Sequence, residues 1–446
     1  VLFRSKIVDA EPIENDLRFS PDYELSEIDT MFAWRNEGGI NGVIESCNGA
    51  GVCRKLAQSG GTMCPSYMAT SDEKDSTRGR ANVFRQVFEG KNPEGFNSSD
   101  LKDALELCLS CKACKSECPA NVDMAKLKAE FDYGWQHNNG VSLKNQFFTG
   151  TSKFYPLASK FPGISNAMAN SEMGKHILKT FFGISKKRTL PEFAIKPFDI
   201  KPYESPKTNR KKVVLLVDVF NQHHHPEVVE AAIKVFYHLG YEVLIPPLAE
   251  TGRVSISKGR LDQAKEQAFL ITDILAPFVD EGIPIVGLEP SEVLTIRDEY
   301  LDLVDENDLD KATEISKYSF LFEEFLVRHP VPDSLPKAGK VVVHQHCHAK
   351  VLSSKTALQN MLEQWGFEVI LLDAGCCGMA GSFGYEHDKY EVSMKIGRER
   401  LFPAIQLLGK GSNICAPGFS CRHQIMDGTN REALHPAQLI AKQLSN

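Results

Sequence analysis

The chain has 446 residues, of which 42% are apolar and 24% charged, and its formal net charge is −7. This composition is typical of a globular protein with two or three domains and excludes a disordered or fibrous chain, while the negative charge argues against nucleic acid as a main partner. The sequence has no run of about 18 apolar residues that could span a membrane, and its amino terminus lacks the apolar core of a signal peptide, so we expect a cytoplasmic protein, either free or peripheral to the inner face of the membrane.

The first 212 residues divide into three parts. Residues 1–40 are polar, contain prolines and begin VLFRSKIVDAEP without a methionine, which we interpret as a connector from a missing amino-terminal domain. Residues 41–185 are expected to be mostly helical, because apolar residues recur at helical spacing between cysteine-rich turns. Residues 186–212 contain four prolines and a basic run, a composition typical of a linker.

From residue 213 onward, short β-branched runs alternate with helical segments, which predicts an α/β domain with buried parallel strands. Strands are expected near residues 213, 241 and 283, and again in the same order near 340, 367 and 412. We therefore interpret residues 213–446 as a duplicated domain, with a first repeat at 213–330 and a second at 340–446. His435-Pro436 is expected to begin the last helix, because proline suits a first helical turn.

The twelve cysteines gather in three groups, and in a reducing compartment such clustering favours metal binding over disulfide bonds. The strongest motif is LCLSCKACKSECP at residues 107–119, a complete C-x2-C-x2-C-x3-C-P run with the spacing that binds [4Fe–4S] clusters in bacterial ferredoxins. A zinc site and free core thiols are the alternatives. The cysteines of this motif are Cys108, Cys111, Cys114 and Cys118.

A degenerate copy of the motif lies upstream. Cys47 and Cys53 flank Ala50, which stands where the middle cysteine would be, and Cys64 precedes a proline. In two-cluster ferredoxins the cysteine before proline binds the other cluster, so we expect the ligands to cross between the motifs. One full cluster is then expected on Cys108, Cys111, Cys114 and Cys64. A second iron–sulfur cluster is expected on Cys47, Cys53 and Cys118, with a single-cluster protein as the alternative.

The third group of cysteines follows the ends of predicted strands. In AGCCGMAGSFG, residues 374–384, Cys376 and Cys377 are adjacent. A disulfide between neighbours is strained, whereas a cation would relieve the repulsion between two thiolates. Parallel sheets bind ligands at the carboxyl ends of their strands, which predicts an iron–sulfur cluster or a single metal there, with buried structural thiols as the alternative. The expected ligands are Cys347, Cys376, Cys377 and Cys421, with Cys415 as a fifth candidate and His346 as either a ligand, a hydrogen-bond donor to one, or an ordinary core histidine.

The two repeats differ at these positions. When they are aligned, the positions of the four expected ligands are occupied in the first repeat by Val219, Glu250, Thr251 and Glu292. The second repeat therefore keeps the ligands and the first is expected to be a scaffold. Phosphate-binding loops, nucleophile elbows and paired acidic motifs are missing, so we assign no catalytic residue.

Seven stretches together resemble the carboxyl-terminal half of the bacterial FAD-linked oxidases: CNGAGVC, MCPSYMAT, STRGRA, LCLSCKACKSECPANVDMAKLKAE, GLEPSEVLTIRDEY, CCGMAGSFGY and GFSCRHQI. The resemblance covers nearly the whole chain from about residue 40. It implies a helical ferredoxin-like [4Fe–4S] domain followed by a duplicated α/β cysteine-rich (CCG) domain with parallel sheets. The cysteine-free first repeat is most similar to the D-2-hydroxyglutarate dehydrogenase branch, with D-lactate dehydrogenases and glycolate oxidases close behind.

The CCG domain is also similar to one of the iron–sulfur components of anaerobic glycerol-3-phosphate dehydrogenase and of heterodisulfide reductase. It departs from the latter, because the final C-x2-C is replaced by Cys415-x5-Cys421. This difference favours a single cluster or a metal over a double cluster at the CCG site.

The resemblance implies an oxidoreductase in which FAD, bound to the missing amino-terminal half, takes a hydride from a D-2-hydroxyacid. This chain would pass the electrons on to a quinone or a soluble carrier. The alternatives are a heterodisulfide-reductase-like thiol/disulfide subunit, the electron-transfer subunit of a glycerol-3-phosphate or glycolate dehydrogenase, and a non-redox zinc scaffold. The sequence leaves the substrate, the acceptor, the number of clusters and any homo-oligomer open.

Overall fold

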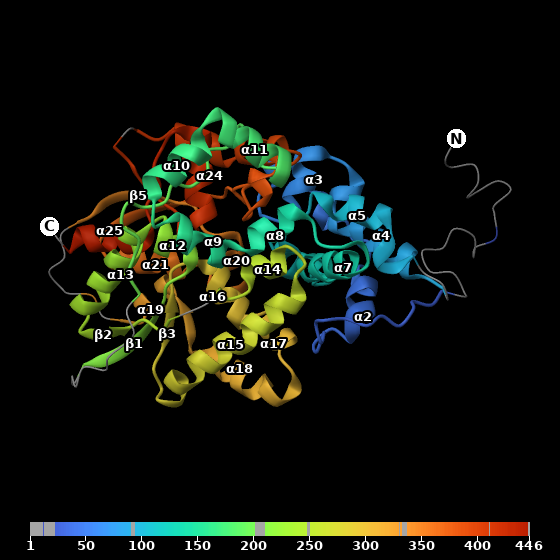
Figure 1. The fold of residues 1–446 in the computed structure, drawn as a ribbon, viewed down its shortest axis with the longest axis horizontal. Coiled ribbons are helices and arrows are strands. Elements are labelled where there is room, and N and C mark those ends of the chain that lie inside the picture. Colours follow the sequence, from blue (N-terminus) through green and yellow to red (C-terminus); the bar gives the residue numbers. More distant parts are fainter. Residues whose placement is uncertain are drawn as a thin grey trace.

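The computed structural model describes residues 12, 23–90, 94–200, 210–247, 250–329, 331, 337–409 and 411–444. Within these residues, a helical region lies at one end of the molecule and two small parallel sheets lie at the other (Figure 1). The parallel sheets expected in the second half of the chain are therefore present. The described helices include none with the length and apolar character needed to cross a membrane.

Three helices of the helical region begin where the sequence provides a capping side chain. The side chains of Ser76, Ser98 and Asp123 accept hydrogen bonds from backbone N–H groups at the starts of three helices, as short polar residues do at N-caps. Phe84 packs edge-on against Phe131 in the core of this region. The helices are α2 (Gly39–Ser46), α3 (Pro65–Thr70), α4 (Thr77–Phe88), α5 (Ser99–Glu106), α6 (Ala113–Glu117) and α7 (Met124–Asn139). Short 3-10 helices cover Val52–Arg54, Ala57–Ser59, Glu73–Asp75 and Gly95–Asn97.

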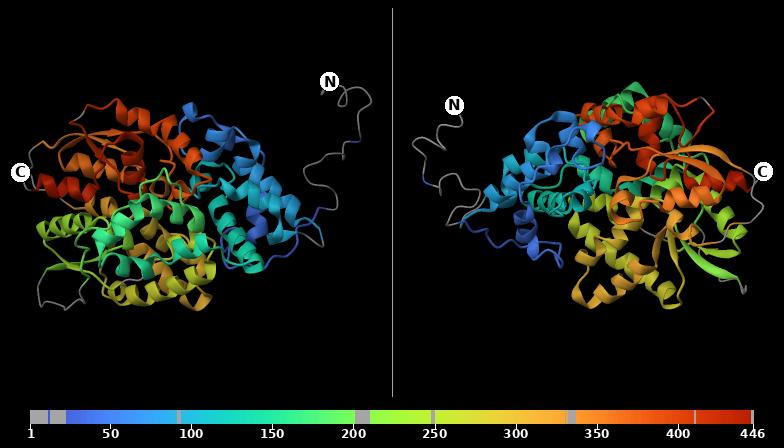
Figure 2. Two further views of the ribbon diagram at one scale, coloured as in Figure 1. Left: turned by 45° about the horizontal axis from the view of Figure 1, so that its top comes forward. Right: turned by 180° about the vertical axis from the view of Figure 1, so that it is seen from behind.

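Four further helices lie on the outside of the α/β part, in the foreground of the left view in Figure 2. They are α8 (Leu143–Thr149), α9 (Thr151–Ala158), α10 (Pro162–Asn170) and α11 (Glu172–Phe182). The segment expected to be a linker follows them. Arg188 in this segment is buried, and its guanidinium donates to the Gly384 carbonyl oxygen and to the Asp427 carboxylate.

The first sheet has the strand order β2-β1-β3-β4, and all of its pairs are parallel. Its strands are β1 (Lys211–Leu216), β2 (Tyr241–Leu244), β3 (Ile285–Gly287) and β4 (Ser319–Leu321). The helices of this unit are α12 (Val219–His223), α13 (Pro226–His238), α14 (Arg253–Ser257), α15 (Leu261–Asp280), α16 (Pro290–Arg297), α17 (Tyr300–Leu303), α18 (Glu306–Tyr318) and α19 (Phe322–Leu326).

The second sheet has the order β6-β5-β7 and is also parallel. In both sheets the strand that comes first in the sequence lies between the next two strands. Its strands are β5 (Gly339–Val343), β6 (Phe367–Leu371) and β7 (Asn413–Cys415). Its helices are α20 (Cys347–Leu352), α21 (Ala357–Gln364), α22 (Tyr390–Glu399), α23 (Leu401–Gln406), α24 (Phe419–Thr429) and α25 (Pro436–Gln443), with a 3-10 turn at Phe383–Tyr385. His435 caps α25, which confirms the predicted start of the last helix.

One hydrophobic core joins the two sheets, because Val213 and Leu215 of β1 belong to the same buried cluster as Val341 and Val343 of β5. A second core continues from the helical region into α15 to α18. The α/β part and the helical region are thus held against each other by shared apolar packing. This packing brings the carboxyl end of β5 close to α6.

Candidate iron–sulfur and metal centres

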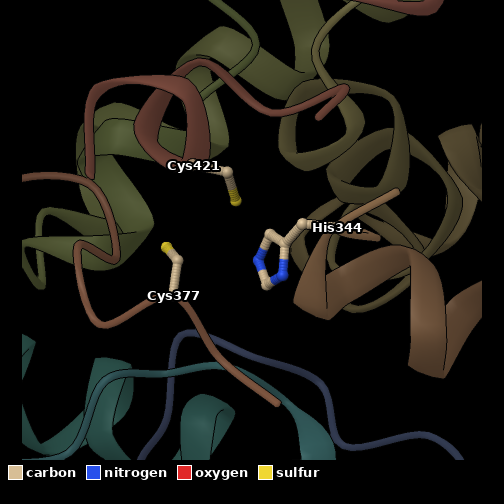
Figure 3. A group of neighbouring side chains, drawn as sticks. All are labelled: His344, Cys377 and Cys421. Atoms are coloured by element: carbon tan, nitrogen blue, oxygen red, sulfur yellow. The ribbon is translucent and has the colours of Figure 1, made fainter. Parts of the chain in front are cut away.

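The cysteines of the second sheet converge at the carboxyl ends of its three strands. Cys347 is the first residue of α20 after β5, the adjacent Cys376 and Cys377 follow β6, and Cys421 lies in the first turn of α24 after β7. Figure 3 shows the sulfurs of Cys377 and Cys421 on either side of a gap that the ring of His344 also faces. The ligand atoms of these last three residues lie within 4.8 Å of one another.

The four thiols of this site form a row in which each thiol is hydrogen-bonded to the next through a proton. A hydrogen bond with Cys376 lowers the pKa of Cys347 to about 6, and the same bond raises the pKa of Cys376 well above its usual value. Hydrogen bonds with Cys376 and Cys421 hold the pKa of Cys377 well below the usual value. A cation bound here would replace the shared protons and leave thiolates, which are the metal-binding form of cysteine.

The backbone supports negative charge on these sulfurs. The N–H groups of Gly378 and Met379 each donate to a cysteine sulfur at 3.4 Å. Gly378 has φ +94°, and a Cβ at this position would lie 2.4 Å from the Ser393 carbonyl oxygen. The CCG turn therefore needs glycine both for its conformation and for space. The charge of Lys350 lies near Cys347 and Cys376 and adds to the positive surroundings.

His344 is the site residue that the sequence-based ligand set omits. It is buried, and its ring shares a hydrogen bond with the Cys377 thiol. A bound metal ion could take the place of that hydrogen bond, because neutral imidazole is a common metal ligand. The feature that could have identified His344 as a site residue is the alternation of side chains along β5. Val343 faces the core shared by the sheets, so the next residue, His344, points to the opposite face.

Two candidate ligands, His346 and Cys415, lie outside the group formed by His344, Cys377 and Cys421. His346 is the N-cap of α20, where Nδ1 accepts a hydrogen bond from the His348 backbone N–H, and its Nε2 lies 3.9 Å from the Glu289 carboxylate. It borders the site without joining the closest ligand group. Cys415 is fully buried in the core shared by the sheets, and that burial raises its pKa. Its neighbour Ile414 faces the cluster that contains Cys377 and Cys421 instead.

In the helical region, Cys53 and Cys64 are brought into direct contact. Their hydrogen bond lowers the pKa of Cys53 to about 6 and raises that of Cys64. Cys64 also accepts from the Thr77 backbone N–H at 3.2 Å. The charge of Arg78 lies near Cys47 and Cys53, so this group also has positive surroundings.

The cysteines of the complete motif lie in the loop before α6, on α6 and at its end. Cys111 and Cys114 are buried, and burial raises the pKa of both, to about 12 for Cys114. Cys108 and Cys118 are half-buried and lie within electrostatic reach of Cys114. Cys64 is also within reach of Cys114, so it lies between the two cysteine groups of this region. The donor set, which is thiolate-rich and largely shielded from water, fits iron–sulfur ligation.

The complete motif and the CCG site adjoin each other. Cys111 lies within electrostatic reach of Cys347, and the His348 ring lies 3.0 Å from the Ser110 carbonyl oxygen. A cavity of about 530 Å³ runs beside this contact. The cysteines that line the cavity are Cys108, Cys347, Cys376, Cys377 and Cys421.

Comparisons with known proteins agree with this geometry. Residues 46–123 match the 4Fe-4S dicluster domain family. The chain is 26% identical to D-2-hydroxyglutarate dehydrogenase of Pantoea ananatis (strain AJ13355). The matched region includes 90% of this chain and 43% of that relative. It is also 22% identical to the glycolate oxidase iron-sulfur subunit of Escherichia coli (strain K12), covering 90% of this chain and 94% of that subunit.

A third relative is one of the subunits of the anaerobic glycerol-3-phosphate dehydrogenase of Escherichia coli (strain K12), which is 26% identical over 68% of this chain and 78% of its own length. The first of these relatives is thus a dehydrogenase, and the other two are subunits of an oxidase and of a dehydrogenase. These findings confirm the resemblance inferred from the sequence motifs. The chain spans less than half the length of the D-2-hydroxyglutarate dehydrogenases that it matches.

Proposed function

We propose that this chain is the iron–sulfur electron-transfer portion of an FAD-linked D-2-hydroxyacid dehydrogenase that acts on D-2-hydroxyglutarate or D-lactate. The adjacency of Cys111 and Cys347 carries the proposal, because it joins a 4Fe-4S dicluster domain to a second buried thiol site. Electrons leaving a flavin could then pass through the chain from one group of cysteines to the other. Similarity over nine tenths of the chain to D-2-hydroxyglutarate dehydrogenases supports the substrate class.

We infer that the domains are a connector at 1–40, the ferredoxin-like domain at 41–185, a linker at 186–212 and a duplicated CCG domain at 213–446. The matching strand orders β2-β1-β3 and β6-β5-β7 support the duplication. A hydrogen bond in the first repeat also supports the duplication. Thr251 and Glu292 occupy the positions aligned with Cys377 and Cys421, and the Thr251 hydroxyl donates to the Glu292 carboxylate. In this proposal the first repeat is a scaffold: it keeps the contact between these two positions but has no cysteines there.

Iron–sulfur clusters, when bound, would supply one-electron carriers to this chain. In the ferredoxin-like domain we assign one [4Fe–4S] cluster to Cys108, Cys111, Cys114 and Cys64, and a second cluster to Cys47, Cys53 and Cys118. We assign a cluster or metal at the CCG site to Cys347, Cys376, Cys377 and Cys421. His344 is added to this last set, and His346 is kept as a bordering residue.

The residues around these ligands would hold negative charge and exclude water. Arg78 and Lys350 place positive charge near the upstream cysteines and near the CCG site, respectively. Backbone N–H groups point at Cys376 and Cys377. Positive charge and N–H donors around cluster sulfurs stabilise the reduced state and so raise its potential. The partners are the FAD-binding half of the protein and a quinone or soluble electron carrier.

A thiol/disulfide subunit similar to heterodisulfide reductase is a second candidate. The observation that favours it is the cavity of about 530 Å³ that reaches the sulfurs of the CCG site, since a disulfide substrate needs such access. The two candidates differ in where electrons leave the protein. Reduction of a disulfide substrate by the protein, with a chemical reductant supplying the two electrons in place of the flavin, would favour the second candidate.

The test of the first candidate uses the full-length, iron-loaded protein under anaerobic conditions. Adding D-2-hydroxyglutarate should reduce the flavin and then give the EPR signal of a reduced cluster. In Cys111→Ser, flavin reduction should keep its rate, while cluster reduction and turnover with an external acceptor should fall at least about tenfold. Unchanged turnover in this variant would exclude the electron-transfer role, whereas a failure to reduce the flavin with either D-2-hydroxyglutarate or D-lactate would exclude the substrate assignment.

A further inference from the structure

Helices α9 to α11 and the residues between them carry an apolar surface that the described part of the chain leaves uncovered. Neither α10 nor α11 has a buried residue. Contiguous exposed apolar surface marks an interaction site, whereas scattered single residues do not. Eight large apolar side chains between 44% and 75% exposed gather on this short stretch: Phe154, Leu157, Phe161, Ile164, Met168, Met173, Ile177 and Phe181.

The apolar residues lie on outward faces of these helices. On α11, Met173, Ile177 and Phe181 are spaced by four residues and form one exposed stripe, while Leu178 and Phe182 pack inward against the core of the second α/β unit. On α10, Ile164 and Met168 have the same spacing. Helix α11 therefore carries apolar residues on the face turned away from the protein as well as on the face that packs against it, and α10 adds two more exposed apolar residues.

The same stretch is strongly basic in a chain whose net charge is negative. Residues 143–188 contain seven lysines and one arginine against a single glutamate. Lys153 and Lys160 are exposed beside the apolar residues of α9 and α10, and Lys186 is exposed just after α11, next to Lys187, which pairs with Glu391. Exposed apolar side chains flanked by lysines match the surface of a bilayer that contains anionic lipids.

The large cavity opens onto this surface. Phe154, Met168 and Ile177 line the cavity and are themselves exposed, so they lie at its mouth. Cys376 and Cys377 line the same cavity. A lipid-soluble molecule that entered at α10 and α11 would therefore reach the CCG site through a largely apolar passage.

The described part of the amino-terminal segment is remote from this surface. Ser26 and Phe32 contact α4 and α7 through hydrogen bonds to the Phe88 carbonyl oxygen and the Glu130 carboxylate. This end of the molecule lies on the opposite side of the helical region from α10 (Figures 1 and 2). The segment that follows residue 22 thus leaves α10 and α11 open.

We propose that α9, α10 and α11 form a docking surface for an anionic lipid bilayer. The apolar residues insert at the level of the lipid headgroups and the lysines bind the headgroup phosphates. Docking in this orientation turns the mouth of the cavity toward the lipid. The proposal goes beyond the electron-transfer role and gives that role a class of acceptor, namely one that is dissolved in the membrane.

The test is sedimentation of the iron-loaded protein with vesicles of phosphatidylcholine alone or mixed with phosphatidylglycerol. The protein should bind the mixed vesicles and bind phosphatidylcholine at least about tenfold more weakly. Ile164→Glu/Met168→Glu and, separately, Lys153→Glu/Lys160→Glu should each weaken binding to mixed vesicles about tenfold or more. Because these side chains are exposed, the variants should keep the thermal unfolding midpoint of the parent.

Matched controls carry the same chemical changes elsewhere. Leu270→Glu/Leu407→Glu replaces two exposed leucines outside the surface, and Lys311→Glu/Lys317→Glu reverses two solvent-accessible lysines of α18. Both should bind like the parent. Equal loss in a control, or no binding to mixed vesicles, would overturn the proposal.

Two other occupants of the surface give distinct results. Self-association that Ile164→Glu/Met168→Glu abolishes, without vesicle binding, would assign the surface to a second copy. Hydrogen exchange protection of α10 and α11 in the full-length protein, without vesicle binding, would assign it to the flavin-binding half. Because sedimentation does not depend on turnover, the surface can be tested even where the proposed substrate fails.

Discussion

The ring of His348 joins the CCG site to the complete cysteine motif, with Nε2 3.0 Å from the Ser110 carbonyl oxygen. Burial holds the pKa of His348 well below its usual value, so the ring is neutral. Since a carbonyl oxygen only accepts, Nε2 carries the proton and donates it. This hydrogen bond connects the residue after Cys347 to the residue before Cys111, and so it sets the approach of the two thiol sites.

Replacing His348 by alanine should leave the Ser110 carbonyl oxygen buried without its donor and lower the free energy of unfolding by about 1–3 kcal/mol. Chemical denaturation followed by circular dichroism measures this change. Hydrogen exchange should also become faster in the loop at residues 108–112. His137→Ala, at an exposed position of α7, is the control and should change neither quantity. Equal exchange rates in His348→Ala would show that the contact does not hold the loop.

The CCG site should lose its metal or cluster when one of its thiols is removed and keep it when the neighbouring core thiol is removed. Cys377→Ala deletes a sulfur that contacts Cys376 and Cys421, whereas Cys415→Ala deletes one that faces the core between the sheets. Iron, zinc and acid-labile sulfide per chain, measured on protein purified without oxygen, check this. A full [4Fe–4S] centre at this site corresponds to a difference of about four irons. Equal loss in Cys415→Ala would contradict the ligand assignment.

Lys112 should be the main electrostatic support between the cysteine loop and the first α/β unit. It is buried and forms ion pairs with Asp298 and with Glu299 at 2.6 Å. Lys112→Met would leave these carboxylates buried with fewer partners, which costs about 3–5 kcal/mol. Denaturant unfolding at pH 7 measures the cost. Lys74→Met, which breaks an exposed pair with Asp103, should cost about 1 kcal/mol or less.

Acidification should reduce the difference between Lys112→Met and the parent protein. Lys112 and Lys115 hold the pKa of Asp298 well below its usual range against the effect of burial. A carboxylate with a lowered native pKa contributes stability that is complete above the unfolded value of 3.8 and is lost as the pH falls below it. A difference that stays constant from pH 7 to below pH 3 would contradict this ion pair.

Glu292 should give the opposite dependence on pH. Burial raises its pKa to about 8, against 4.5 for an ordinary glutamate. Between these values the native state binds a proton that the unfolded state has lost, so stability falls as the pH rises through this window. Glu292→Gln should remove up to about 1.4 kcal/mol per pH unit of this slope. Unfolding measured from pH 5 to 8 checks it, with the surface variant Glu314→Gln as a control that keeps the parent slope.

The sequence by itself determined the features that depend on residues close together in the chain. The spacing of Cys108, Cys111 and Cys114 predicts a cluster-binding loop, because a [4Fe–4S] cluster commonly takes three of its thiolates from one tight turn. The β-branched runs predict parallel strands, whose side-chain alternation is also local. The family resemblance, the start of α25 at Pro436 and the position of the CCG cysteines at strand ends follow from such patterns.

Only the tertiary structure decided which of these groups meet. His344 rather than His346 joins Cys377 and Cys421, because the chain turns into α20 directly after β5 and makes His346 a helix cap. Cys415 leaves the site because its side chain points to the other face of β7. The proximity of Cys111 to Cys347 depends on packing between elements more than 200 residues apart in sequence, and hydrophobic burial, which drives that packing, is not directional. Local patterns therefore predict the ligands, and long-range packing decides how they are arranged.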